Sequence, residues 1–229
     1  MAAIELCSVG KVYGRGDAAV TALAGVDLRV ERGEFVVTQG PSGSGKTTLL
    51  NLLAGLDRAT AGTVRVAELD LGDMGDRALS RFRNRHVGYV FQAFYLEPRH
   101  TAVDNVALPL VFAGVRRHER RRRATMLLER VGLNQKLLSR ADTLSAGQKQ
   151  RVALARALVA EPSVLLADEP TANLDRRTGQ EILDLLAEVN SNMGTTVVLV
   201  SHDDQTSVGS PRQLWVEDGR LTARQDTAA

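Results

Sequence analysis

The pattern of apolar and polar positions predicts a chain in which strands alternate with helices. Short apolar runs typical of buried strands occupy 35–37, 86–92, 164–167 and 195–200. Between the last two runs, Ile182, Leu185, Leu186 and Val189 recur at i, i+3, i+4 and i+7, which is the spacing of an amphipathic helix. This alternation favours an α/β fold with a mainly parallel core sheet, whose ligands bind at the carboxyl ends of the strands.

Two other regions depart from this order. Alternating or apolar segments at 4–9, 26–30 and 63–66 predict a small β-rich layer near the N-terminus. After residue 92 the prolines and the helical spacing of apolar positions predict a helical insert. We therefore expect a single domain over 1–229, with a core of 1–92 and 158–229 and a helical subdomain of 93–157.

The segment Gly40–Thr47 reads GPSGSGKT and fits the spacing G-x-x-x-x-G-K-[ST] of a phosphate-binding loop. It lies between the predicted strand 35–37 and the apolar stretch 48–53, which is the strand–turn–helix setting that such a loop requires. Its glycines let the backbone approach a phosphate, and the helix N-terminus supplies N–H groups. Lys46 is predicted to reach the β- and γ-phosphates and Thr47 to hold Mg²⁺. The sequence thus predicts binding of a nucleoside triphosphate.

Polar residues follow several predicted strands directly. Asp168 and Glu169 come after 164–167, where one carboxylate can coordinate Mg²⁺ and the next can polarise a water. His202 comes after 195–200 and is placed to reach a γ-phosphate, whereas a lone histidine is more often structural. Gln92 ends the run 86–92. These residues are candidates for one site at the sheet edge.

The segment Leu144–Gln148 predicts a second anion site. Ser145 is a good helix N-cap, and the apolar residues Val152, Ala155 and Val159 make the following helix amphipathic. One triphosphate already has its own loop, so this site would complete a nucleotide bound to another copy or to a homologous domain. Helix capping alone is the alternative.

Composition and charge limit the kinds of binding partner and the cellular location that we expect for this protein. The net charge of +2 gives no reason to expect a nucleic-acid partner. The only cysteine, Cys7, is expected to be a buried strand residue that packs. The chain contains no apolar run of 18 residues and no basic leader, so we expect a cytosolic protein attached to a membrane only through another one. The basic run 116–123 predicts either a solvated helix face or a surface for anionic lipid headgroups.

Over Ile4–Leu221 the chain resembles the ATP-binding cassette (ABC) ATPases, which are P-loop NTPases with an antiparallel β-subdomain and a helical subdomain. The loop matches Walker A, Leu144–Gln148 resembles the LSGGQ signature, and 165–169 resembles Walker B with its following glutamate. Gln92 matches the Q-loop, 173–175 the D-loop and His202 the switch histidine.

The resemblance implies a head-to-tail homodimer that sandwiches two ATP molecules and works with an integral membrane permease. It implies that Tyr13 stacks on adenine, that Thr47, Gln92 and Asp168 serve Mg²⁺, that Glu169 activates water and that His202 senses the γ-phosphate. Catalysis is thereby assigned to Glu169, His202 and Gln92. The implied nucleotide-binding residues are Tyr13, Gly40, Pro41, Ser42, Gly43, Ser44, Gly45, Lys46, Thr47, Thr48, Ser145, Ala146, Gly147, Gln148 and Asp175.

Finer matches at 11–14, 22–26, 31–35, 83–92 and 101–106 resemble the macrolide-exporter and lipoprotein-release group. The chain departs from the family pattern in three places. Ala146 replaces the first signature glycine, and the residues in segments 94–100 and 208–212 differ from the usual ones. We expect the energy subunit of a membrane export or lipoprotein-release system. A regulatory ATPase of cell-envelope division is the alternative, and a soluble ABC protein of DNA repair or translation is disfavoured because neither a coiled-coil insert nor a second cassette is present.

Overall fold

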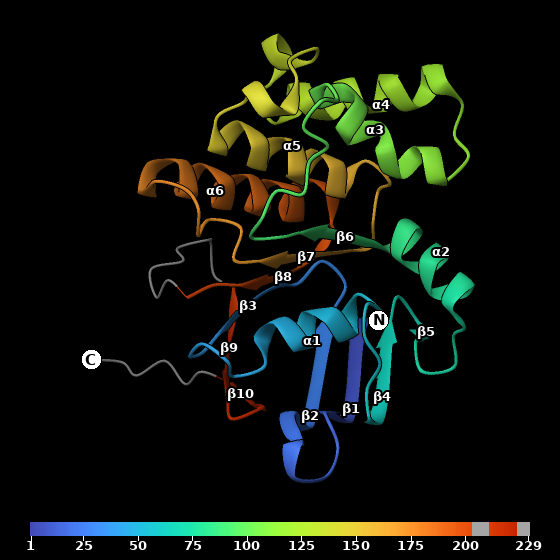
Figure 1. The fold of residues 1–229 in the computed structure, drawn as a ribbon, viewed down its shortest axis with the longest axis vertical. Coiled ribbons are helices and arrows are strands. Elements are labelled where there is room, and N and C mark those ends of the chain that lie inside the picture. The colour runs from blue at the N-terminus through green and yellow to red at the C-terminus, as the bar shows by residue number, and fades with distance from the viewer. Residues whose placement is uncertain (203–210, 224–229) are drawn as a thin grey trace.

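A computed structural model describes residues 1–202 and 211–223, so residues 208–210 of the divergent segment 208–212 lie outside the described part. Figure 1 shows three levels: a four-stranded sheet with α1 above it, a six-stranded sheet, and helices α3 to α6 beyond that second sheet. The expected combination of a core sheet, an antiparallel sheet and a helical region is confirmed.

The six-stranded sheet has the order β10-β9-β3-β8-β7-β6. All its neighbouring pairs are parallel except β9 with β10. The strands are β3 (Phe35–Gln39), β6 (Val87–Val90), β7 (Val164–Asp168), β8 (Thr196–Val200), β9 (Arg212–Glu217) and β10 (Arg220–Ala223). The predicted strand 86–92 is longer than the real one, because His86 ends a helix and Phe91 lies beyond the last paired residue.

The four-stranded sheet is antiparallel and has the order β2-β1-β4-β5. Its strands are β1 (Ala2–Tyr13), β2 (Val20–Glu31), β4 (Ala61–Val66) and β5 (Leu69–Asp70). The first two are longer than predicted, because register shifts between β1 and β2 interrupt the regular alternation. The connection between β1 and β2 holds a short 3₁₀ helix, Gly16–Ala18.

The main helices are α1 (Lys46–Leu53), α2 (Asp76–His86), α3 (Ala102–Phe112), α4 (Arg117–Arg130), α5 (Ala146–Leu158) and α6 (Arg176–Met193). Two 3₁₀ helices, Asn134–Lys136 and Ala141–Thr143, connect α4 to α5. Helix α2 occupies a polar and basic stretch to which the pattern of apolar positions assigns no element. Leu79 and Phe82, three residues apart, are its buried positions.

Helices cover the two faces of the core sheet differently. On one face, α1 packs on side chains such as Leu166 and Val198, in a core shared with the antiparallel sheet. On the other face, α5 and α6 pack on their neighbours Leu165 and Val197. A separate core joins α3, α4 and α5. Because successive strand side chains point to opposite faces, the two layers of helices are divided by the sheet.

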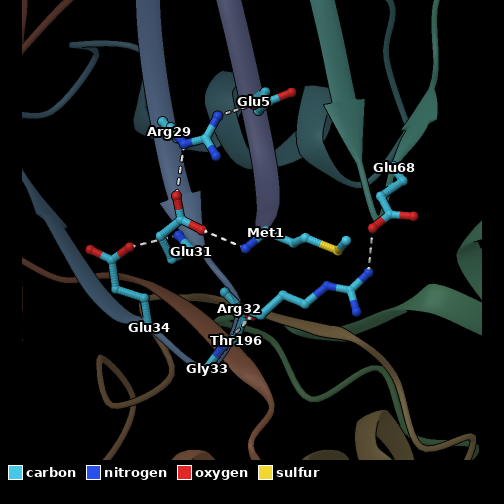
Figure 2. Close-up of polar contacts among 9 residues, drawn as sticks. All are labelled: Met1, Glu5, Arg29, Glu31, Arg32, Gly33, Glu34, Glu68 and Thr196. Atoms are coloured by element: carbon cyan, nitrogen blue, oxygen red, sulfur yellow. Dashed lines mark hydrogen bonds and ion pairs between the residues drawn. The ribbon is translucent and has the colours of Figure 1, made fainter.

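The two sheets are joined by polar contacts around the turn after β2 (Figure 2). The Gly33 amide donates to Thr196 Oγ1 of β8 at 3.0 Å, and Arg32 pairs with Glu68 at 2.7 Å. Asn190 of α6 donates to the Gly33 carbonyl at 2.8 Å. The turn is therefore anchored on both the antiparallel sheet and the core.

One expectation of the sequence is corrected by the exposure of a side chain. Cys7 is exposed rather than buried, because its side chain lies on the solvent side of β1. Throughout 1–202 and 211–223, no helix combines the length and the apolar character that spanning a bilayer requires.

Candidate nucleotide-binding site

The phosphate-binding loop connects β3 to α1, as its sequence predicts. Gly40 and Gly45 have φ angles of 148° and 108°, and a Cβ at either would lie 2.0 Å from the Val216 carbonyl oxygen or 2.3 Å from that of Ala22. No side chain fits at these two positions, so the tight loop depends on glycine there. Gly43, in the middle of the loop, also has a positive φ.

Lys46 is folded into this loop. Its Nζ donates to the carbonyl oxygens of Gly40 at 2.8 Å and Pro41 at 2.7 Å, and the residue is buried. Burial lowers the pKa of Lys46, while the nearby carboxylates of Glu169 and Asp168 act in the opposite direction. A buried ammonium of this kind gains most from an anion placed in the loop.

The buried hydroxyl of Ser44 has no hydrogen-bond partner among the described residues. Pro41, Ser42 and Gly43, which precede it, are exposed. The loop thus offers an unused hydroxyl and an accessible backbone, both of which suit a phosphate group.

Asp168 lies at the carboxyl end of β7, across from the loop. Its Oδ1 accepts a hydrogen bond from Thr47 Oγ1 at 3.4 Å. Burial raises the pKa of Asp168, and the hydrogen bond from Thr47 opposes that shift. The two residues bring together a hydroxyl and a carboxylate oxygen, which are hard donors of the kind Mg²⁺ prefers.

Glu169 and His202 meet at the ends of two neighbouring strands. Glu169 has a positive φ of 47°, and its amide donates to the Val200 carbonyl at 3.0 Å. Its Oε1 lies 2.5 Å from His202 Nε2. A positive φ at a residue other than glycine is a local backbone strain, and such strain is often found at functional sites.

Gln92 follows β6 and is exposed. Its carbonyl oxygen accepts a hydrogen bond from Asn173 Nδ2 at 2.9 Å, which links the Q-loop and D-loop positions within one chain. Tyr13 lies at the end of β1, is 41% exposed, and donates from its hydroxyl to Asp57 Oδ2 at 2.7 Å. Thr48 is the third residue of α1 and half-buried.

The signature residues form the start of α5. Ser145 Oγ accepts from the Gln148 amide at 3.3 Å, and Gln148 Oε1 accepts from the Ser145 amide at 3.1 Å, so both halves of a capping box are present. The helix starts with Ala146 and Gly147, which are exposed and half-exposed. This end of α5 is therefore preformed and accessible.

Gly147 touches the start of α6. A Cβ on Gly147 would lie 2.4 Å from Thr178 Cγ2. Thr178 is fixed by Asp175, the N-cap of α6, whose carboxylate accepts from the Thr178 amide at 3.0 Å and from its hydroxyl at 2.6 Å. The signature segment and the D-loop residue Asp175 are thus held together.

The two predicted anion sites lie on opposite sides of the core sheet. The phosphate loop opens α1, whereas the signature opens α5, and these helices cover different faces (Figure 1). The structure brings Lys46, Thr47, Asp168, Glu169 and His202 to one edge. Ser145 to Gln148 and Asp175 form a second group at the start of α5 and α6.

Some residues of the site carry no signal in the sequence. The Tyr89 hydroxyl is buried, and burial together with the Asp168 carboxylate raises the pKa of Tyr89. Asp57, which holds Tyr13, is 44 residues away from it along the chain. Both contacts arise from tertiary structure, and the sequence offers only the aromatic and acidic side chains themselves.

Fold and site define a class of protein: an α/β nucleotide-binding protein with a phosphate loop and a second, capped helix N-terminus on the other face of its sheet. Residues 23–172 match the family model described as ABC transporter. The chain belongs to the ABC transporter family and is an ATP-binding ATPase of that family.

Known proteins are similar over most of the chain. This chain is 44% identical to the lipoprotein-releasing system ATP-binding protein LolD of Alcanivorax borkumensis, over 92% of each chain. It is 46% identical to the macrolide export ATP-binding/permease protein MacB of Rhodopirellula baltica, over 94% of this chain and 32% of that one. The solved dimer of the ATP-binding cassette MJ0796, bound to ADP and Pi, matches with a TM-score of 0.89 and 39% identity over 99% of each chain.

Proposed function

We propose that this protein is the ATP-hydrolysing energy subunit of a membrane export or lipoprotein-release system. One observation carries the dimeric part of the proposal: the phosphate loop and the signature lie on opposite faces of the sheet. One triphosphate can contact both only if the signature comes from a second copy. A head-to-tail homodimer satisfies this condition at two equivalent sites.

In this dimer the phosphate loop, Gly40 to Thr47, with Thr48 behind it, holds the triphosphate, and Tyr13 stacks on adenine. Lys46 exchanges its loop carbonyls for phosphate oxygens, a change favoured by its burial. From the other copy, Ser145, Gly147, Gln148 and Asp175 complete the site. Ala146 places a methyl group where the family pattern has glycine, next to the amides of the helix start.

Thr47, Asp168 and Gln92 would hold Mg²⁺ together with the phosphates, and the 3.4 Å approach of Thr47 to Asp168 fits that assignment. The ion would supply charge neutralisation on the phosphate oxygens. Glu169 accepts the proton of the attacking water, and its contact with His202 holds its carboxylate at the strand end. His202 is placed to contact the γ-phosphate.

The proposed partner is an integral membrane permease, which would keep the ATPase at the cytoplasmic face of the membrane. A groove of about 450 Å³ lies between α2, α3 and the end of α5 and exposes Tyr95 and Phe112. Gln92 follows β6 and is adjacent in sequence to Phe91, which lines this groove. A permease segment bound in the groove could therefore shift Gln92 and so affect the Mg²⁺ site. We propose the helical subdomain, residues 93–157, as the part that faces the permease.

The test compares Lys46→Ala and Glu169→Gln with the matched surface variant Glu188→Gln, whose side chain is exposed on α6. Lys46→Ala should lose ATP binding. Glu169→Gln should keep ATP binding, lose at least about 100-fold in turnover and accumulate as an ATP-bound dimer in size-exclusion chromatography. Parent-rate hydrolysis by Glu169→Gln would refute the assignment of the general base.

A second variant tests the dimer. Ser145→Arg places a long cation at the signature and should block dimerisation while the monomer still binds ATP. Unchanged hydrolysis in Ser145→Arg would refute the sandwich. A regulatory role in cell-envelope division is the alternative function, and co-purification with division proteins in place of a permease would favour it.

A further inference from the structure

Tyr13 is held by side chains that the nucleotide-binding motifs do not include. Lys11 and Tyr13 are two residues apart on β1 and therefore lie on the same face of that strand. Asp57 follows α1, and its carboxylate accepts a hydrogen bond from each of them. Lys11 Nζ donates to Oδ1 at 2.6 Å, and the Tyr13 hydroxyl donates to Oδ2 at 2.7 Å. Lys11 Nζ also donates to the Arg58 carbonyl at 2.8 Å. The Tyr13 ring is thus tied to the end of α1.

Lys11 also covers one face of the ring. Its Nζ lies 4.7 Å from the centroid of Tyr13, within the range of a cation–π contact. Lys11 is only 9% exposed, so its ammonium is fixed by Asp57 and Arg58 rather than left in solvent. One face of Tyr13 is therefore occupied, and an incoming base has the other face available.

We propose that Lys11 and Asp57 are positioning residues that hold the Tyr13 ring at the angle and depth required to stack on the nucleobase of ATP. The inference rests on the proposed role of Tyr13 in adenine binding. Asp57 fixes the outer end of the ring, and Lys11 fills the face that the base does not use. Without these contacts the half-exposed ring is less well ordered, and base stacking must then offset the entropy of ordering it.

A purely structural role predicts something different. If the pair only fastened the antiparallel sheet to α1, its loss would shift the whole loop and weaken every phosphate ligand equally. A role in positioning Tyr13 affects only ligands that carry a base. Comparing ATP with inorganic tripolyphosphate, each with Mg²⁺, separates these two cases.

Isothermal titration calorimetry on the full chain provides the measurement, with Asp57→Asn, Lys11→Met and Tyr13→Phe as variants. We expect each to weaken ATP binding by about 5- to 10-fold, a part of what stacking on an aromatic residue contributes, and to change tripolyphosphate binding by less than about 2-fold. The control is Asp70→Asn, which, like Asp57→Asn, removes one carboxylate from an ion pair. Asp70 pairs with Arg65 on the antiparallel sheet, and its loss should change neither the affinity for ATP nor that for tripolyphosphate.

A double-mutant cycle completes the test. In a Tyr13→Ala background, Asp57→Asn should cause no further loss of ATP affinity. Equal losses for ATP and tripolyphosphate, or full ATP affinity in both Asp57→Asn and Tyr13→Phe, would overturn the inference. If Tyr13→Ala itself binds ATP like the parent, the proposed stacking role of Tyr13 fails; if only the Asp57 and Lys11 variants are unaffected, the positioning role alone fails.

Discussion

Replacing Gly147 with alanine should loosen the contact between the signature helix α5 and the start of α6. The added Cβ would lie 2.4 Å from Thr178 Cγ2, about 1 Å closer than carbon atoms pack. Thr178 is not free to rotate away, because its hydroxyl donates to Asp175 at 2.6 Å and its amide to the same carboxylate. One of the two helices must therefore move.

The change in the free energy of unfolding of Gly147→Ala is the difference between two opposed effects. Overpacking of this kind costs about 1–3 kcal/mol. Alanine in place of glycine inside a helix contributes about 0.5–1 kcal/mol in the other direction. Taking the middle of each range, we expect the free energy of unfolding of Gly147→Ala to fall by about 1 kcal/mol and its melting temperature to fall by about 2–4 °C.

Urea denaturation of the variant measures this change. Thr178→Ser removes Cγ2 and keeps the hydroxyl on Asp175, so the double variant Gly147→Ala/Thr178→Ser should return to near the stability of the parent. The matched control is Gly179→Ala on α6, where the new Cβ would meet Thr171 Cβ at an ordinary 3.4 Å. If Gly147→Ala is as stable as Gly179→Ala, or if Thr178→Ser does not restore it, the steric argument is wrong.

Three further predictions concern stability. Ser145→Ala removes the N-cap of α5 and should lower the free energy of unfolding by about 0.5–2 kcal/mol in urea denaturation; full stability would show that the capping box contributes nothing. Leu128→Ala, in the fully buried core of α3, α4 and α5, should cost about 2–5 kcal/mol in the same assay, and a loss below 1 kcal/mol would mean that the site collapses around the cavity. Arg122 and Arg123 lower the pKa of Glu119 from 4.5 to about 2, so its stabilising effect is present above pH 4.5 and is lost as the pH falls toward 2. The melting temperature of Glu119→Gln should lie below that of the parent at pH 6, and this difference should shrink, not grow, on acidification.

The parts of the site that are local in sequence could be predicted from it. The phosphate loop, the capped start of α5 and the carboxylates after β7 each depend on neighbouring residues, and the structure places them in the predicted elements. The strand ends then bring Asp168, Glu169 and His202 together, because β7 and β8 are parallel neighbours.

Other features depend on contacts that no local pattern encodes. The hydrogen bond from Tyr13 to Asp57 joins a strand to the residues after a helix. Gly147 and Thr178, which are 31 positions apart in the sequence, join α5 to α6. The pattern of apolar positions does not predict helix α2, because arginines dominate this stretch, although Leu79 and Phe82 at i and i+3 have helical spacing. The basic run 116–123 lies mostly on α4, where Glu119 pairs with Arg122 and Arg123, and Arg121 pairs with Asp104 of α3. These two carboxylates face six arginines, so the run remains strongly basic.

The position of β3 in the core sheet has a consequence for how the chain is made. The antiparallel sheet uses only residues 2–70, so it can assemble while the rest of the chain is still being translated. Strand β3, in contrast, lies between β8 and β9, which are synthesised roughly 160 residues later, or about 8–30 s at ordinary elongation rates. Both edges of the strand that leads into the phosphate loop therefore remain open on the ribosome during that interval. Open strand edges pair readily with other chains, so this segment is exposed to aggregation and to chaperones until β8 and β9 have been made.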